Sequence, residues 1–319
     1  MGYSAYICPG EYLNLPLCHI RKNTQITVSA KGKKMKFIFG RGENTFQGYS
    51  VEIDKDSLHL FQYLAAQKNI GNYAHTLGES TTITAVVDYS DGTDASLTLI
   101  GDCGQLFAVN VNWWAGGGVY LQNLGEKNLQ AAIIFHVKDT ECPVWFFGDS
   151  YFNWRDSARW PYYVYQDGYT NWLADHQPGE ASGEAIKCLE HDLKLGTPKY
   201  AVWCLGMNDP SDTDAPNAIW LSAVNRFLVL CAEKNITPIL ATIPSVPERN
   251  HKGKAQWVRN SGYRYIDFAE AVEAADNGLW QEGMLSADGV HPSQLGAKAM
   301  AAQVLKDFPE IAITKKNIK

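Results

Sequence analysis

The stretch VWFFGDSYFNW, residues 144–154, indicates the fold more clearly than any other part of the chain. Four apolar residues, Val144 to Phe147, lead into Gly-Asp-Ser, and more aromatic residues follow. A short continuous apolar run is typical of a strand that is buried on both faces. Gly, Asp and Ser are common turn residues, so one interpretation is a plain turn. The other is that Ser150 stands at the open end of a sheet because it reacts with a substrate.

The chain after residue 143 continues this alternation. Apolar runs at 144–148, 200–206, 237–244 and 263–268 alternate with amphipathic segments at 183–195, 215–235 and 292–308. Near-continuous apolar strands separated by helices predict an α/β domain with a parallel sheet covered on both faces. Ligands of such sheets bind beyond the carboxyl ends of the strands, which is where GDS and the later GMND both fall.

The first part of the chain has a different residue pattern. Its short runs are rich in β-branched and aromatic residues, as in TQITVSA, KKMKFIFG, STTITAVVDYS and QAAIIFHVKD. Six or more such strands predict a β-sandwich or jelly roll, and only residues 56–69, DSLHLFQYLAAQKN, are ambiguous between strand and helix. Since 319 residues usually form two domains, we expect an accessory β domain over residues 1–142 and a catalytic domain over residues 143–319.

Three polar residues form a chemical set. In chain order they are Ser150, Asp288 and His291, an order known for nucleophile, orienting acid and base. A serine hydroxyl is a weak nucleophile near neutral pH, so it needs a base, and histidine suits that role. The imidazolium that forms needs an anion at its other nitrogen. Asp288 can supply the anion if the DGVH loop folds back, a turn that Gly289 favours.

A serine that attacks a carbonyl also needs hydrogen-bond donors for the oxyanion. The candidates are the backbone N–H of Ser150, the backbone N–H of Gly183 and the side-chain amide of Asn208. Asn208 lies in CLGMND, directly after a predicted strand, and Gly183 lies in PGEASGEA, where Gly179 is the competing glycine. Gly183 is preferred because it stands at the start of a predicted helix.

The blocks FFGDS, ASGE, LGMND and DGVHP resemble the four signature blocks of the SGNH (GDSL-type) hydrolase superfamily. The resemblance covers about residues 143–310 and lies in the order and spacing of the blocks. It implies a flavodoxin-like three-layer domain with Ser150 as nucleophile, an oxyanion hole at Gly183 and Asn208, and the Asp288/His291 pair. Members of this superfamily are esterases, lipases, thioesterases and carbohydrate deacetylases. Several of its carbohydrate esterases carry a preceding jelly-roll domain.

The aromatic run from Tyr151 to Trp172 departs from the sequence familiar in that superfamily. Its rings either pack in the core or against the first domain, or they form a platform beside Ser150 that holds a sugar ring. On the second interpretation, Tyr151, Trp154 and Trp160 are candidate substrate contacts.

Charge and composition limit the partners. A net charge of −6 without a Lys/Arg-rich run argues against a nucleic acid or an anionic membrane. No apolar stretch is long enough to span a bilayer, and the first residues lack a signal-peptide pattern. Seven irregularly spaced cysteines without a Cys-x-x-Cys pair indicate a reduced protein, which we expect in the cytoplasm. No residues have the spacing of a metal site.

The sequence thus predicts a serine esterase that needs no cofactor or metal and acts on a small-molecule or oligosaccharide ester. O-acetyl groups on a carbohydrate are the leading substrate. A lipase or thioesterase of the same superfamily is one alternative, since it uses the same residues with a long apolar channel. A glycan-binding protein with an inactive hydrolase domain is the other.

Overall fold

The computed structural model describes most of the chain. The described residues are 2–15, 24–32, 34–41, 47–54, 57–63, 67–74, 81–88, 95–101, 104–111, 118–137, 142–152, 157–176, 179–193, 196–213, 215–275 and 278–315. The chain divides into two compact units, Met1–Asp139 and Thr140–Lys319. This division lies three residues before the boundary expected at 142/143.

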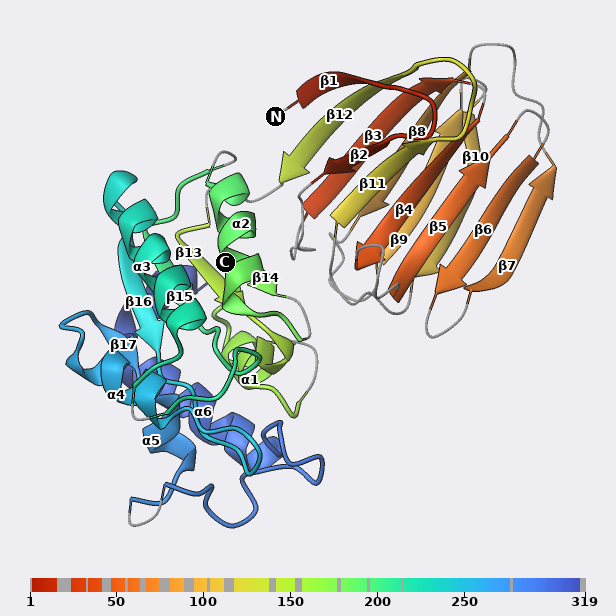
Figure 1. Ribbon diagram of the computed structural model, residues 1–319. Coiled ribbons are helices and arrows are strands. Elements are labelled where there is room, and N and C mark those ends of the chain that lie inside the picture. Colours follow the sequence, from red (N-terminus) through yellow and green to blue (C-terminus); the bar gives the residue numbers. More distant parts are fainter. Residues whose placement is uncertain are drawn as a thin grey trace. The chain divides into compact units, whose positions relative to one another are not determined.

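The first unit is built of strands. They are β1 (Gly2–Ile7), β2 (Tyr12–Leu15), β3 (Thr24–Gly32), β4 (Met35–Arg41), β5 (Gln47–Ile53), β6 (Ser57–Tyr63), β7 (Gln67–Ala74), β8 (Thr81–Asp88), β9 (Ala95–Gly101), β10 (Gly104–Val111), β11 (Gly118–Asn123) and β12 (Leu129–Val137). They form two six-stranded antiparallel sheets, ordered β1-β12-β3-β8-β9-β10 and β2-β11-β4-β5-β6-β7 (Figure 1). The ambiguous segment 56–69 contributes β6 and the start of β7, which pair as antiparallel neighbours.

Burial in this unit follows the period of a strand. Met35 and Phe37 of β4 are fully buried, as are Val51 and Ile53 of β5. Successive side chains of a strand point to opposite faces, so these residues place one face of their sheet in the core of the unit.

The second unit contains one five-stranded parallel sheet. Its strands are β13 (Val144–Gly148), β14 (Trp172–His176), β15 (Tyr200–Trp203), β16 (Thr237–Ala241) and β17 (Tyr265–Ile266), in the order β14-β13-β15-β16-β17. This is the 2-1-3-4-5 order of flavodoxin-like folds, and it confirms the predicted parallel α/β sheet. The sequence analysis missed β14, because WLADH is short and polar at its end.

Helices cover both faces of this sheet. They are α1 (Trp160–Gln166), α2 (Ser182–Asp192), α3 (Ala218–Glu233), α4 (Lys252–Asn260), α5 (Phe268–Val272) and α6 (Gln294–Asp307), with short 3-10 turns at Ser150–Phe152 and Pro309–Thr314. α1 and α5 pack against α6, and α2 packs against α3. Asn217 and Ser293 cap the first turns of α3 and α6 by accepting backbone N–H bonds.

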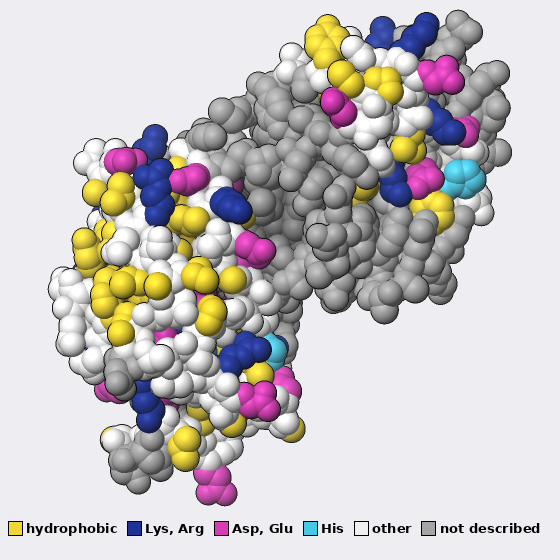
Figure 2. Space-filling model, in the orientation of Figure 1, with side chains coloured by type: hydrophobic (Ala, Val, Ile, Leu, Met, Phe, Trp, Pro, Cys, Tyr) yellow, Lys and Arg dark blue, Asp and Glu magenta, His cyan; other side chains and the backbone are white. Residues whose placement is uncertain are grey.

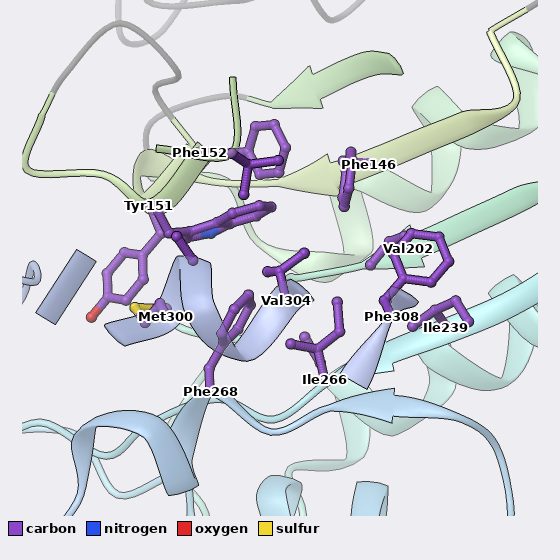
Figure 3. Close-up of a cluster of buried hydrophobic side chains, with 14 of the residues drawn as sticks. Phe146, Tyr151, Phe152, Val202, Ile239, Ile266, Phe268, Met300, Val304 and Phe308 are labelled. Carbon is purple, nitrogen blue, oxygen red and sulfur yellow. The ribbon is translucent and has the colours of Figure 1, made fainter. Parts of the chain in front are cut away.

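Neighbouring residues of β13 point into different halves of the core. Phe146 faces the α6 side, where it belongs to a buried cluster that includes Met300 and Val304 of α6 (Figure 3). Phe147 stacks on Trp203, which in turn contacts Phe227 of α3 with ring centroids 5.1 Å apart. The unit therefore has three layers, and β13 lies in the middle layer.

The surface of the second unit carries charges of both signs. On the face that Figure 2 shows, Lys and Arg side chains lie among Asp and Glu side chains. Among the helices that the structure describes, none combines the length and the apolar character needed to cross a bilayer.

Candidate active site

The turn after β13 holds Ser150. Asp149 stands between the strand and the 3-10 turn that Ser150 begins. The backbone N–H of Tyr151 donates to Asp149 Oδ1 at 3.0 Å, and the N–H of Phe152 donates to the Asp149 carbonyl at 3.0 Å. A Cβ on Gly148 would lie 3.0 Å from the Cβ of Phe152, so glycine permits this tight turn. Ser150 is thereby fixed, half-buried, at the carboxyl end of β13.

The loop Ser286–His291 brings a histidine to this serine. His291 Nε2 lies 2.8 Å from Ser150 Oγ, and His291 Nδ1 lies 2.8 Å from Asp288 Oδ2. Asp288 Oδ1 accepts the backbone N–H groups of Val290 at 2.8 Å and His291 at 2.9 Å. Gly289 has a φ of 71°, the left-handed conformation that lets the loop fold back as the sequence suggested.

These contacts keep Asp288 ionised. Its limited burial raises the pKa, but hydrogen bonds from the N–H groups of His291 and Val290 lower it more, so the pKa lies well below its usual range. A carboxylate at Nδ1 favours the tautomer with the proton there. Nε2 is then free to accept the proton of the Ser150 hydroxyl.

Tyr151 joins the serine turn to the histidine loop. Its hydroxyl donates to the backbone carbonyl of Val290, and its ring centroid lies 5.7 Å from that of His291. Only 7% of its surface is exposed. This corrects the expectation that Tyr151 forms part of a sugar platform. Its ring is buried in the core, and its hydroxyl is bonded to the histidine loop.

Trp160 needs the same correction. It is 1% exposed and packs edge-to-face on Phe152, with ring centroids 4.8 Å apart. The cavity that both rings line beside the serine turn has a volume of about 10 Å³, room for one water at most. Both rings are buried in the apolar core, so they present no open face to a sugar. Trp154 lies outside the described residues.

Asn208 follows β15 and faces the serine turn. Its Nδ2 donates to the Glu180 carbonyl at 3.1 Å and to Asp149 Oδ2 at 3.3 Å, while its Oδ1 accepts from Arg249 Nη1 at 3.3 Å. A flipped amide would set acceptor against acceptor and donor against donor, so these partners fix its orientation. β13 and β15 flank the point where the strand order reverses, which is the usual ligand position in such sheets.

The sequence offered two candidates for the oxyanion glycine, Gly183 and Gly179. Gly183 lies in the first turn of α2, where an added Cβ would meet Ile219 of α3 at 3.9 Å. The residue of this segment that contacts Asn208 is Glu180, directly after Gly179. Gly179 has a φ of 76°, a backbone conformation that favours glycine. The contact between Glu180 and Asn208 supports Gly179 as the candidate oxyanion glycine, whereas Gly183 was preferred for its place at the start of a helix.

Asp149 belongs to the amide side of the site. Burial raises its pKa to about 7, against the lowering effect of the Tyr151 N–H, and the nearby carboxylate of Asp209 raises it further. Its oxygens contact Tyr151 N–H and Asn208 Nδ2. Asp149 is thus placed to orient Asn208.

A buried ion pair supports the loop that carries Asn208. Lys254 Nζ lies 2.7 Å from Asp212 Oδ1 and donates to the Pro210 carbonyl at 2.9 Å, and neither charged side chain has exposed surface. Asp209 accepts from both the N–H and the hydroxyl of Ser182, which ties the same loop to α2. Sequence analysis missed Lys254 and Arg249; their place after a strand, in SVPERNHKGK, was the available signal.

The described contacts join a hydroxyl, an imidazole and a carboxylate in one chain beside a fixed amide, an arrangement suited to acyl transfer. In the part of the chain that the structure describes, no three or more His, Cys, Asp and Glu side chains are grouped so as to hold a metal ion.

No family model and no curated protein matches this sequence. Among solved structures, the chain is similar to a GDSL-like lipase from Bacteroides thetaiotaomicron, with 17% identity, 55% of this chain and 91% of that chain covered, and a TM-score of 0.42. It is similar to the psychrotrophic esterase EstA from Pseudoalteromonas sp., with 15% identity, coverages of 53% and 98%, and a TM-score of 0.41. A carbohydrate esterase family 3 structure from Talaromyces cellulolyticus has 15% identity, coverages of 55% and 99%, and a TM-score of 0.41.

Proposed function

We propose that this chain is a serine esterase that removes O-acyl groups, with O-acetyl groups on a carbohydrate as its substrate class. The observation that carries the proposal is the chain of contacts at the site. His291 Nε2 lies 2.8 Å from the Ser150 hydroxyl, and His291 Nδ1 lies 2.8 Å from Asp288. Both distances are within the reach that proton transfer requires.

The reaction proceeds in two halves. Ser150 Oγ attacks the acyl carbon while His291 takes its proton, and Asp288 stabilises the imidazolium. His291 then gives the proton to the departing alcohol, which leaves an acyl-enzyme. A water that His291 activates attacks this ester, releases the acid and restores Ser150.

Three donors serve the oxyanion in this proposal: the N–H of Ser150, the N–H of Gly179 and the amide of Asn208. Both N–H bonds of Asn208 face protein acceptors, and the longer contact, 3.3 Å to Asp149 Oδ2, is the one that the oxyanion would replace. A donor that is already oriented costs little reorganisation when the charge develops.

A short acyl group is supported by the packing around the turn. Tyr151, Phe152 and Trp160 fill the apolar space next to Ser150, and about 10 Å³ remains between them and their neighbours. This small cavity behind the serine turn cannot take a long acyl chain, which supports a short acyl group in the proposal. The carbohydrate part of the proposal is supported by the resemblance to two-domain carbohydrate esterases.

Hydrolysis of nitrophenyl esters from acetyl to decanoyl tests this function. We expect turnover to be highest with the acetyl ester and to fall by several orders of magnitude in Ser150→Ala. Ser261→Ala, at the end of α4 before β17, is the matched control and should keep full activity. A Ser150→Ala variant as active as the wild type would contradict the mechanism.

The ester series and two further measurements separate the alternatives. A preference for decanoyl esters would identify a lipase or thioesterase. A protein that retains glycans without turnover, and whose Ser150 is not labelled by a fluorophosphonate, would be a binding protein. Acetate release from acetylated glycans then tests the substrate class.

A further inference from the structure

Arg249 lies beside the amide that the proposed mechanism assigns to the oxyanion. It belongs to the loop between β16 and α4, at the carboxyl end of the sheet. Its Nη1 donates to the Met207 carbonyl at 3.0 Å and to Asn208 Oδ1 at 3.3 Å. The guanidinium is therefore held against the site by one of its nitrogens.

The other edge of this guanidinium is open. Within the described part of the chain, Nε and Nη2 of Arg249 make no hydrogen bond, and neither is sealed from solvent. No carboxylate among the described residues lies within 4.0 Å of it.

In Arg259 of the same unit, the Nε and Nη2 edge of the guanidinium binds a carboxylate. Its Nε donates to Asp267 Oδ2 and its Nη2 to Asp267 Oδ1, both at 2.8 Å. Arg226 and Arg264 also have carboxylate partners, at 2.8 Å and 2.6 Å. A planar fork of two N–H donors matches a carboxylate, and Arg249 presents that fork without one.

A second guanidinium contacts the nucleophile's own backbone. Arg159 Nε donates to the Ser150 carbonyl at 2.8 Å. Burial raises the pKa of Tyr151 well above its ordinary value, while the charges of both Arg159 and Arg249 lower it, so both arginines act on the region around the serine turn. Both arginines therefore lie near the serine turn, together with the carboxylates of Asp149 and Asp288, which raise the same pKa.

We propose that Arg249 binds an anionic group of the substrate, so that the esterase acts on an acylated sugar that carries a carboxylate. This inference rests on the proposed esterase function and narrows its substrate class to acidic sugars. Nη1 stays on Asn208, and Nε and Nη2 form two parallel hydrogen bonds to the carboxylate. The carboxylate then sets the position of the ester over Ser150.

The test compares two substrates that differ only in charge: an O-acetylated hexuronic acid and its methyl ester. In the wild type we expect kcat/KM for the acid to exceed that for the methyl ester by about tenfold or more, the size of one charge-assisted pair. In Arg249→Met the ratio should fall to about one. Any disturbance of Asn208 lowers both rates alike and cancels in the ratio.

Arg226→Met removes an equal charge on α3 and should keep the wild-type ratio. Arg249→Lys keeps the charge without the fork and should give an intermediate ratio. Added salt should lower the rate for the acid and leave the methyl ester unchanged.

Nitrophenyl acetate, which is neutral, distinguishes the two proposals. If the wild type hydrolyses it but shows a ratio near one, the anion site is refuted and the esterase stands. A high ratio that survives in Arg249→Met also refutes the role of Arg249. If the folded protein hydrolyses no ester, the esterase proposal fails and this inference fails with it.

Discussion

The two sides of the candidate site are held in place by different forces. The sheet side consists of the Ser150 turn and the loop that carries Asn208, and its polar groups are buried, with Asp149 at 1% exposure and Lys254 at 0%. The loop side, Ser286–His291, has no regular element, and the side chain of Asp288 is 53% exposed. Hydrogen bonds to its own backbone define that loop. Changes to the buried groups that support the sheet side should therefore cost stability, whereas changes to Ser150, to Asn208 or to the loop side should cost activity.

The largest effect is expected from breaking the buried ion pair of the sheet side. Lys254→Met leaves the carboxylate of Asp212 buried without its cation, a loss that typically costs about 3–5 kcal/mol. Urea unfolding followed by tryptophan fluorescence would measure this as a lower midpoint. Lys306→Met is the control, because Lys306 pairs with Glu270 at 3.3 Å on the surface, where such pairs contribute about 0–1 kcal/mol. Equal midpoints for the two variants would contradict the assignment.

Next in size is the loss of the amide donor. Asn208→Ala should lower kcat by about 100- to 1,000-fold, the usual cost of one oxyanion donor, which corresponds to about 2.7–4 kcal/mol. The reason is that Asn208 supplies a side-chain N–H that Asp149 and the Glu180 carbonyl hold beside the serine turn. Asn217→Ala removes the cap of α3 and should lower stability by about 1 kcal/mol without changing kcat. A kcat for Asn208→Ala within tenfold of the wild type would show that the backbone donors suffice.

The stability of the sheet side should also depend on pH, because Asp149 is buried there. The folded pKa of Asp149 is about 7 and its ordinary value is 3.8, so between these values the folded state binds more protons than the unfolded state. The free energy of unfolding should therefore fall as pH rises from about 4 to 7, by at most about 1.4 kcal/mol per pH unit from this group. Asp149→Asn removes that contribution.

The difference between the two unfolding curves isolates Asp149. Burial also raises the pKa of Glu273, which is not coupled to Asp149 and contributes equally to both proteins. Urea unfolding at several pH values should thus give a flatter curve for Asp149→Asn. Parallel curves would mean that Asp149 is ionised in the folded protein across this range.

The sequence identified those site residues that carry a local signal. Ser150 and Asn208 follow apolar runs, and Asp288 and His291 share a short loop with Gly289, whose φ of 71° matches the turn that was expected. Strand ends and turns are encoded by neighbouring residues, so a reading of short blocks can find them.

What the sequence did not reveal depends on contacts between distant segments. Arg249 reaches Asn208 from 41 residues away, and Lys254 reaches Asp212 from 42 residues away. The choice between Gly179 and Gly183 depends on which residue of the segment meets Asn208, which is a tertiary contact. The sequence left Trp160 open between a place in the core and a contact with a sugar, because an aromatic ring can serve either equally well.

The smallest predicted effect tests the hydrogen bond from Tyr151 to Val290, which joins the two sides in addition to the contact between His291 and Ser150. Tyr151→Phe keeps the ring that packs beside His291 and removes the hydroxyl that donates to the Val290 carbonyl. One hydrogen bond of this kind contributes about 0.5–1.5 kcal/mol, so kcat for nitrophenyl acetate should fall by about two- to tenfold with little change in the urea midpoint. Tyr163→Phe, which loses a similar bond to the Ser157 carbonyl, should leave kcat unchanged. If Tyr151→Phe lowers stability and not kcat, then the hydroxyl belongs to the packing of the sheet side, and Asp288 alone positions His291. If Tyr151→Phe lowers kcat and not stability, the bond from Tyr151 sets the distance between the loop and Ser150. The loop's own hydrogen bonds then fix only the shape of the loop.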